Sequence, residues 1–313
     1  MAVDTILFGD CRETLKTLEE RPRMCVTSPP YYGLRDYGGE QSQIGQEQTP
    51  EEYIQNLVEV FRSVRDVLAD DGTLWVNIGD SYYNYRPGKG QSYPKQSVSK
   101  TKQDLPEQCN KRGNKLEGLK EKDLIGIPWM FAFAMRADGW YLRQDIIWHK
   151  PNPMPESVRD RCTKSHEYIF LFSKNRKYYY DNEAIKEPVK QDWGTRNRTN
   201  GKYHNEGTGL APHSGLTKSY TTKNKRSVWT VTNKPYKGAH FAVYPPDLIE
   251  PCIKAGSEEG DIVLDPFMGS GTTALVSKSL QRHYIGCELH EDYGRLIQKR
   301  LSEKSFARLK LDE

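Results

Sequence analysis

Two short apolar runs, more than two hundred residues apart, each lead into a loop with an unusual composition. Met24-Cys25-Val26 precedes Ser28-Pro29-Pro30-Tyr31, and Ile262-Val263-Leu264 precedes Asp265-Pro-Phe-Met-Gly-Ser-Gly271. Prolines fix the backbone of the first loop into a rigid corner, and glycines let a ligand approach the backbone of the second. Each motif therefore has the form of a β-strand that ends in a binding loop.

The N-terminal third of the chain alternates between strand and helix patterns. Thr5–Phe8 is a short apolar strand, and Thr49-Pro50-Glu51-Glu52 combines an N-cap, a first-turn proline and a capping-box glutamate. Apolar residues then recur at helical spacing before the apolar strand Thr73–Ile78. This β-α-β order predicts an α/β fold with a parallel sheet and helices on its faces.

Further elements follow between two polar segments that lack periodicity. We expect helices near 124–137 and 247–255, after Gly271 and at the C-terminal end, and strands near 142–148, 168–172, 262–264 and 284–287. The expected division is a doubly wound core made of 1–80, 123–180 and 235–313, a polar mobile insertion at 81–122, and a second polar region at 181–234.

Composition favours a cytoplasmic protein without a metal. No run of about 18 apolar residues is present, and the N-terminus lacks the basic start and apolar run of a signal peptide. The six cysteines are scattered without a Cys-x-x-Cys pair, which favours reduced thiols. Cys162 and His166 have a spacing found in metal sites, but no second pair accompanies them.

Basic residues are concentrated in segments 86–122 and 190–226, although the formal net charge is only +4. Solvated loops would explain this charge alone. Aromatic side chains are interleaved with or follow the second segment: Trp193, Tyr203, His204, Tyr220 and Trp229. Phosphate contacts combined with stacking rings favour a polynucleotide partner.

The glycine loop is typical of a site for an adenosine-bearing cofactor. Gly269-Ser-Gly271-Thr-Thr-Ala274 fits G-x-G-x-x-A between a strand and a helix, where helix N–H groups face a ligand. Glu288 ends the next strand about 20 positions further on, where an acid accepts ribose hydroxyls. NAD and S-adenosylmethionine both fit this pattern, and an ordinary strand-to-helix turn is the alternative. A G-x-x-x-x-G-K-[ST] loop is absent, which argues against an NTPase.

The proline corner favours chemistry on the exocyclic amine of a base, which is a poor nucleophile because its lone pair is delocalised. The Ser28 hydroxyl and the Pro29 carbonyl would accept hydrogen bonds from the amine, and Tyr31 or Tyr32 would stack on the ring. Methyl transfer from a sulfonium requires positioning and charge complementarity rather than a metal. The base must first leave the duplex. The corner has no evident role in hydride transfer, so it favours S-adenosylmethionine over NAD.

Together the motifs resemble those of the amino-group DNA methyltransferases. The matches are Val-Thr-Ser-Pro-Pro-Tyr at 26–31 and Asp-Pro-Phe-Met-Gly-Ser-Gly-Thr-Thr at 265–273, in the circularly permuted order of the β class. Other matches are Leu-Phe-Gly-Asp-Cys at 7–11, Asp-Ile-Ile-Trp-His-Lys-Pro-Asn-Pro at 145–153, Ser-His-Glu-Tyr-Ile-Phe-Leu-Phe at 165–172, Ser-Val-Trp at 227–229 and His-Phe-Ala-x-Tyr-Pro-Pro at 240–246. The resemblance implies a Rossmann-like methyltransferase fold with a seven-stranded, mostly parallel sheet and one antiparallel strand.

The resemblance also implies roles for individual residues. Glu288 would bind the ribose of the cofactor, Asp10 would meet its adenine amine, and His240-Phe241 would flank it. The methionine end would be cradled by Asp265, Phe267, Gly269 and Gly271. The implied cofactor-binding residues are Asp10, His240, Phe241, Asp265, Phe267, Gly269, Ser270, Gly271, Thr272 and Glu288. The implied catalytic residues are Ser28, Pro29, Pro30 and Tyr31. The region at 181–234 would recognise the DNA target, with Tyr32, Arg35, Arg196, Arg198, Lys202, Lys223, Lys225 and Arg226 as candidate DNA contacts.

A serine at position 28 is usual in the cytosine-N4 enzymes of this family, whereas adenine-N6 enzymes more often carry aspartate, so we expect cytosine N4 with adenine N6 as the alternative. Carbon-5 methylation requires a Pro-Cys nucleophile, and Pro251-Cys252 falls on an amphipathic helix, where Cys252 belongs to the core. A nicotinamide oxidoreductase and a non-catalytic DNA-binding module are the rival hypotheses. Expected partners are duplex DNA, and on family grounds a second copy of the chain and a cognate restriction endonuclease.

Overall fold

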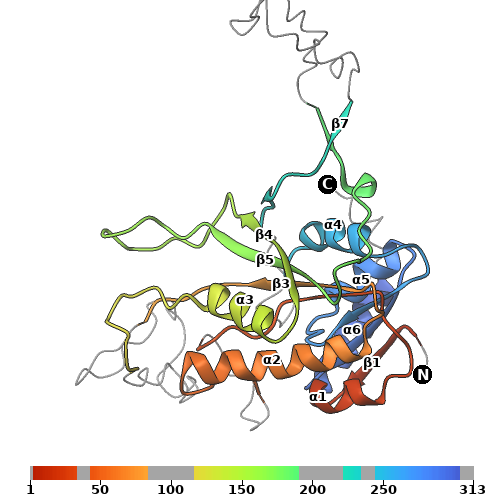
Figure 1. Cartoon of the computed structure of the whole chain (residues 1–313), viewed down its shortest axis with the longest axis horizontal. Coiled ribbons are helices and arrows are strands. Elements are labelled where there is room, and N and C mark those ends of the chain that lie inside the picture. Colours follow the sequence, from red (N-terminus) through yellow and green to blue (C-terminus); the bar gives the residue numbers. More distant parts are fainter. Residues whose placement is uncertain (1–2, 34–42, 84–115, 190–220, 234–243, 304–313) are drawn as a thin grey trace, which may run out of the picture.

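The computed structural model describes residues 3–33, 43–83, 116–189, 221–233 and 244–303. A twisted central sheet lies between layers of helices (Figure 1). Its strands are β1 (Thr5–Phe8), β2 (Met24–Thr27), β3 (Thr73–Ile78), β4 (Tyr141–His149), β5 (His166–Ser173), β8 (Val228–Thr230), β9 (Ile262–Asp265) and β10 (His283–Glu288). They lie in the order β1-β10-β9-β2-β3-β5-β4-β8.

The direction of the strands confirms the expected mostly parallel sheet. Within this sheet β5 runs antiparallel to both of its neighbours, and the other described pairings are parallel. The number of strands is eight rather than the expected seven. The additional strand is β8, which pairs with residues 147–149 of β4. Three residues are too few for an alternating pattern to be recognised in a sequence, so β8 was missed.

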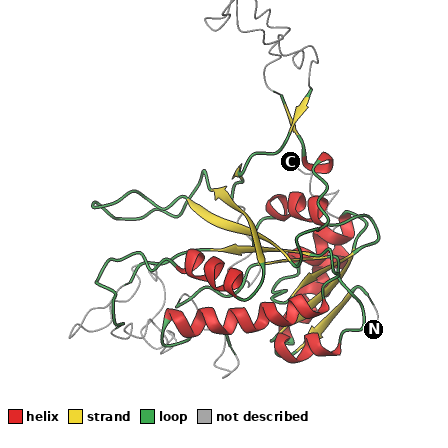
Figure 2. Ribbon diagram, viewed as in Figure 1, coloured by secondary structure: helices red, strands yellow, loops and turns green. Residues whose placement is uncertain are grey.

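Helices cover both faces of the sheet (Figure 2). They are α1 (Cys11–Thr14), α2 (Pro50–Val67), α3 (Ile127–Ala137), α4 (Pro246–Gly256), α5 (Thr272–Ser279) and α6 (Asp292–Glu303), with 3-10 turns η1 (Leu15–Thr17) and η2 (Glu183–Ile185). Cys25 of β2 packs in the cluster formed with α1, α2 and α3, whereas Met24 and Val26 pack in the cluster formed with α4 and α5. Successive residues of a strand point to opposite faces, so β2 is buried on both sides.

The starts of two helices follow from their first residues. The hydroxyl of Thr49 accepts a hydrogen bond from Glu52 N, and the Glu52 carboxylate accepts one from Thr49 N, so the predicted capping box is confirmed. The helix expected from residue 124 begins at Ile127, because Gly126 has a φ of 88°. The Asp80 carboxylate accepts hydrogen bonds from Gly126 N and Ile127 N, at 3.0 and 3.1 Å.

Two segments leave the sheet and return to it, and backbone hydrogen bonds join the start of each segment to its end. Tyr83 N donates to Asp123 O at 2.8 Å, and Lys122 N donates to Tyr83 O at 3.0 Å. In the second segment β6 (Glu187–Pro188) pairs antiparallel with β7 (Thr222–Lys223). Residues 84–115 and 190–220 lie outside the described residues, so the expected character of the segments 81–122 and 181–234 stays a prediction.

Candidate functional site

The carboxyl ends of five neighbouring strands meet at one edge of the sheet. β1, β10, β9, β2 and β3 are adjacent in this order and run in the same direction. Asp10, Glu288, Asp265, Ser28 and Gly79 end these strands or follow them closely, so they are brought to a common edge. Open α/β sheets bind their ligands at this edge. The two loops identified in the sequence therefore lie on neighbouring strands, as their joint function requires.

The Asp265 carboxylate joins the two loops through four hydrogen bonds. Its Oδ1 accepts from Thr27 Oγ1 at 2.5 Å and from Phe267 N at 3.0 Å. Its Oδ2 accepts from Tyr244 Oη at 3.0 Å and from Thr273 Oγ1 at 2.5 Å. The residue is 1% exposed, and burial raises the pKa of the Asp265 carboxyl group, although these four hydrogen-bond donors lower it. Asp265 thus ties the glycine loop to the end of β2, immediately before the proline corner.

The glycine loop has the backbone conformation that its sequence predicts. Gly269 and Gly271 have φ angles of 53° and 78°, in the left-handed region that side chains other than glycine rarely adopt. Gly271 precedes the first turn of α5. A Cβ atom at Gly271 would lie 2.9 Å from Cγ2 of Ile297, so the loop packs closely against α6. The absence of a side chain at Gly271 therefore lets α6 pack against the start of α5.

The hydroxyl groups of the loop are bound by α6. Arg300 Nη1 donates to Ser270 Oγ at 2.8 Å, to Ser270 O at 3.1 Å and to Thr272 Oγ1 at 2.9 Å. Ser270 and Thr272 are each 3% exposed. We infer that any contribution of these two residues to ligand binding comes from their backbone.

Two carboxylates flank the loop at the ends of β10 and β1. Glu288 accepts hydrogen bonds from Gly269 N at 2.8 Å and from His290 N at 3.0 Å, and burial raises the pKa of its carboxyl group. Asp10 caps α1 by accepting a hydrogen bond from Arg12 N at 2.9 Å. Although burial opposes ionisation, hydrogen bonds and charge from Arg12 hold the pKa of Asp10 below its usual value. Both groups can accept further hydrogen bonds from hydroxyls or amines.

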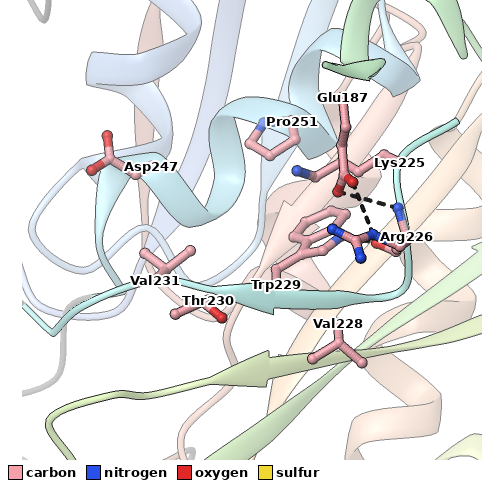
Figure 3. A pocket seen from close by; sticks show the side chains of 9 residues that line it. All are labelled: Glu187, Lys225, Arg226, Val228, Trp229, Thr230, Val231, Asp247 and Pro251. Carbon is pink, nitrogen blue, oxygen red and sulfur yellow. Dashed lines mark hydrogen bonds and ion pairs between the residues drawn. The ribbon is translucent and has the colours of Figure 1, made fainter. Parts of the chain in front are cut away.

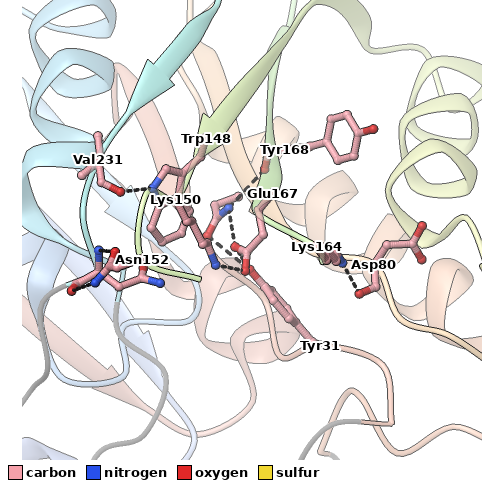
Figure 4. Close-up of polar contacts among 11 residues, drawn as sticks. Tyr31, Asp80, Trp148, Lys150, Asn152, Lys164, Glu167, Tyr168 and Val231 are labelled. Atoms are coloured by element: carbon pink, nitrogen blue, oxygen red, sulfur yellow. Dashed lines mark hydrogen bonds and ion pairs between the residues drawn. The ribbon is translucent and has the colours of Figure 1, made fainter. Parts of the chain in front are cut away.

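The proline corner is fixed from two sides, and Figure 4 shows the side on which Tyr31 contacts Glu167. Tyr53 Oη donates to the carbonyl oxygen of Pro30 at 2.8 Å, and Tyr31 Oη donates to Glu167 Oε2 at 2.7 Å. A Cβ atom at Gly79 would lie 2.7 Å from Cε2 of Tyr31, so the tyrosine ring rests against the backbone after β3. Burial, together with the charge of Glu167, raises the pKa of Tyr31 well above its usual value. This side chain therefore presents a neutral, firmly held ring.

The predicted DNA contacts are only partly among the described residues. Tyr32 lies next to the corner, where its hydroxyl donates to Gln48 O at 3.2 Å and its ring centroid is 5.5 Å from that of Tyr53. The predicted contacts outside the described residues are Arg35, Arg196, Arg198 and Lys202, together with the predicted cofactor residues His240 and Phe241.

Lys223 lies in β7, and the basic residues that follow it line a pocket beside β8 and α4 (Figure 3). Lys225 Nζ lies 5.0 Å from the centroid of the Trp229 ring, and Arg226 Nε lies 3.0 Å from Oε2 of Glu187. Trp229 is 5% exposed and packs in the core cluster. The expectation that Trp229 stacks on nucleic acid is therefore wrong, because β8 places its ring inside the protein.

The described residues contain no group of three side chains with metal-ligating atoms. Cys162 is an exposed free cysteine, whereas Cys252 is buried in α4, as its position on an amphipathic helix predicted. No described helix is both long enough and apolar enough to cross a membrane.

Several residues that complete the site were not predicted. Thr27 and Thr273 lie within the quoted motifs, and Tyr244 begins the Tyr-Pro-Pro triplet, so the motifs contained a signal for them. Arg300 and Glu167 contact residues that are distant in the sequence, and no role could be assigned to them from their neighbours in the sequence.

A doubly wound sheet with a glycine loop beside a Ser-Pro-Pro-Tyr corner defines a Rossmann-like methyltransferase of the β class. A family model described as DNA methylase, of the N6 and N4 amino-methyltransferases, matches residues 23–299. The chain belongs to this family.

Two type II methyltransferases match most of the chain in sequence. The type II methyltransferase M.SmaI of Serratia marcescens is 47% identical over 297 residues, which cover 95% of this chain and 90% of the relative. M.XycI of Xanthomonas campestris pv. cyanopsidis, also a type II methyltransferase, is 46% identical over 298 residues, which cover 95% and 87% of the two chains.

Solved structures share the fold at lower identity. The PvuII DNA methyltransferase, named as cytosine-N4-specific, matches with a TM-score of 0.63 and 18% identity, over 100% of this chain and 91% of that chain. A DNA modification methylase of Thermus thermophilus, solved with S-adenosyl-L-methionine, matches with a TM-score of 0.60 and 22% identity, over 97% and 95% of the two chains.

Membership of this family decides between the hypotheses drawn from the sequence. The chain is a DNA methyltransferase that modifies an exocyclic amino group, rather than a nicotinamide oxidoreductase.

Proposed function

We propose that the chain transfers the methyl group of S-adenosylmethionine to the N4 amine of a cytosine that has been turned out of duplex DNA. The serine at position 28 carries this choice, because the cytosine-N4 enzymes that the chain resembles begin the motif with serine and the adenine-N6 enzymes more often with aspartate. The name of the PvuII enzyme, whose fold the chain shares, agrees with this choice.

The residues at the sheet edge fit S-adenosylmethionine. Each oxygen of Glu288 accepts one hydrogen bond from the backbone, which leaves acceptor capacity for ribose hydroxyls. The ionised Asp10 suits the adenine amine. The loop that contains Gly269 and Gly271 would lie against the methionine end, with Phe267 beside it. Asp265 would support this loop from behind, since its carboxylate oxygens are already bound by protein donors.

The proline corner acts on the amine by accepting hydrogen bonds from its two N–H groups. The Ser28 hydroxyl accepts one N–H and the Pro29 carbonyl accepts the other, which directs the nitrogen lone pair toward the donor. The ring of Tyr31 supports the base by stacking. Bound S-adenosylmethionine would supply the methyl group: the lone pair of the amine would form the new C–N bond while the electron pair of the broken S–C bond stays on sulfur. The proton that the methylated amine then loses would pass to solvent water. These contributions are positioning and charge complementarity.

We assign target recognition to the region at 181–234, where Lys223 and Lys225 would contact duplex phosphates. Arg226 would join them if its pair with Glu187 opens on DNA. A second copy of the chain and a cognate restriction endonuclease are the proposed protein partners. The proposed setting is the cytoplasm of a bacterium or archaeon, or a phage-infected cell.

The assignment of the base is tested by mass spectrometry of nucleosides. Plasmid from a host without its own DNA methyltransferases is treated with the purified chain and S-adenosylmethionine, then digested. N4-methylcytosine is the expected product, whereas N6-methyladenine alone would contradict the assignment. Single-molecule sequencing of the same plasmid would locate the recognised sites.

Arg300→Met is expected to weaken S-adenosylmethionine binding by about three- to tenfold, since the loop loses hydrogen bonds worth about 1 kcal/mol each. Isothermal titration calorimetry measures this change. Arg295→Met removes an exposed arginine from the same helix and should leave the affinity unchanged. Equal affinities for the two variants would show that the Arg300 hydrogen bonds do not support the loop.

A further inference from the structure

A charged cluster contacts Tyr31 of the proline corner (Figure 4). Glu167 accepts hydrogen bonds from Tyr31 Oη at 2.7 Å and from Asn77 Nδ2 at 3.2 Å, both on Oε2. Its other oxygen, Oε1, accepts from the ammonium group of Lys150. The Glu167 and Lys150 side chains are only 14% and 16% exposed. Three donors from different parts of the fold therefore converge on one carboxylate.

The cluster is built by the strands on either side of it. Glu167 of β5 is paired with Trp148 of β4, and Lys150 directly follows β4. Lys150 Nζ lies 4.1 Å from the centroid of the Trp148 ring, so the ammonium group is held by a ring as well as by the carboxylate. Asn77 of β3 also donates to Tyr168 O at 3.1 Å. These contacts fix the Glu167 side chain before any ligand binds.

Tyr31 is the only member of the cluster that belongs to the catalytic motif. Its ring rests against Gly79, and its hydroxyl group donates to Glu167 Oε2 at 2.7 Å and lies 3.3 Å from Asn77 Oδ1, so contacts at the hydroxyl help to set the orientation of the ring. A stacking ring that tilts moves the base that lies on it, and a displacement of about 1 Å can reduce a reaction rate by about 100-fold.

We propose that Glu167 is a positioning residue for methyl transfer, which holds the Tyr31 ring in the orientation on which the target base stacks, while Lys150 balances its charge. This inference rests on the proposed function, because it requires a base on Tyr31. A buried ion pair alone is weak evidence for stability or function. Here the argument rests on the shared oxygen, Oε2, which joins the pair to the catalytic tyrosine.

The test is a double-mutant cycle between Glu167→Gln and Tyr31→Phe. Methyl transfer from tritiated S-adenosylmethionine to plasmid DNA is followed in a single turnover. In the parent chain, Glu167→Gln should lower the transfer rate by about 10- to 100-fold, because its single NH2 group must face either Tyr31 and Asn77 or Lys150, all of which donate to Glu167 in the parent chain. In the Tyr31→Phe background, the same change should cost less than about twofold. The dissociation constant of S-adenosylmethionine should not change.

An equal loss in the two backgrounds would overturn the proposal, since Glu167 would then act independently of the Tyr31 hydroxyl. An unchanged rate for Glu167→Gln would overturn it as well. Tritium counts register a methyl group on either base, so the cycle remains decisive if the product proves to be N6-methyladenine and the proposed function fails.

Two further variants separate positioning from folding. Glu183→Gln removes an exposed carboxylate that pairs with Lys186, and it should transfer methyl groups at the parent rate. If Glu167→Gln fails to fold by circular dichroism, Glu167→Gln/Lys150→Met removes both charges of the buried pair and takes its place in the cycle. Gly79→Ala adds a methyl group against the Tyr31 ring and should reproduce the loss of rate with Glu167 intact.

Discussion

Replacing Ser28 by alanine is expected to lower kcat by about 100-fold, while the affinity for S-adenosylmethionine stays within about twofold. The substitution removes one acceptor for the target amine, and loss of one preorganised polar contact to a reacting group commonly costs a factor of about 100 to 1,000. The cofactor residues lie on other strands, so their contacts are retained. Steady-state methylation of plasmid DNA measures kcat, and calorimetry measures the affinity.

Ser63→Ala is the matched control for this experiment. Ser63 lies on α2, where its hydroxyl donates only to the helix backbone at Glu59 O. This variant should be fully active. Full activity of Ser28→Ala would mean that the hydroxyl group at the corner takes no part in the reaction.

Asp265→Ala is expected to reduce the free energy of unfolding by about 3 kcal/mol and to weaken S-adenosylmethionine binding by more than about tenfold. Removing the carboxylate leaves four donors without their acceptor in a buried site, and a buried unpaired polar group costs about 1 to 3 kcal/mol. The loss of Thr27 and Thr273 contacts also separates the glycine loop from β2. Urea unfolding and calorimetry measure the two effects.

Asp70→Ala provides the comparison for this substitution. The Asp70 side chain is 81% exposed and its ion pairs are 3.6 Å long, so its removal should change the unfolding free energy by less than about 0.5 kcal/mol. If Asp265→Ala were as stable as Asp70→Ala and bound the cofactor normally, Asp265 would not be the link between the two loops.

The sequence was sufficient to predict that the two distant loops lie next to each other. Each loop follows a short apolar strand, and parallel strands direct their carboxyl ends to one edge of a sheet. The requirement for glycine at 269 and 271 was also visible, and the positive φ angles of these residues explain it. These features depend on local residue types and on chain direction, which a pattern of strands and turns already contains.

The sequence did not reveal which way individual side chains point. Asp265 was expected to face the cofactor, yet partners from three separate segments, including Thr27 and Tyr244, turn its carboxylate inward. The hydroxyls of Ser270 and Thr272 similarly meet Arg300 of a later helix. Such orientations are set by contacts between distant segments, and these contacts exist only after the fold has formed.

The sequence also did not reveal that Trp229, an aromatic residue close to a basic segment, is part of the core. Trp229 has neighbours that are typical of a nucleic-acid surface, but it forms part of a three-residue strand whose middle side chain is buried. Glu167 and Lys150 were present in the matched motifs without an assigned role. Their meeting depends on the antiparallel pairing of β4 and β5, which places the end of one strand beside the start of the other.

A crystal structure of the chain soaked with S-adenosylmethionine tests the central claim most directly. We predict that the ribose lies at Glu288, that the adenine amine meets Asp10, and that the methyl group points from the glycine loop toward Ser28. A cofactor bound elsewhere, or one whose methyl group points away from the proline corner, would contradict the account.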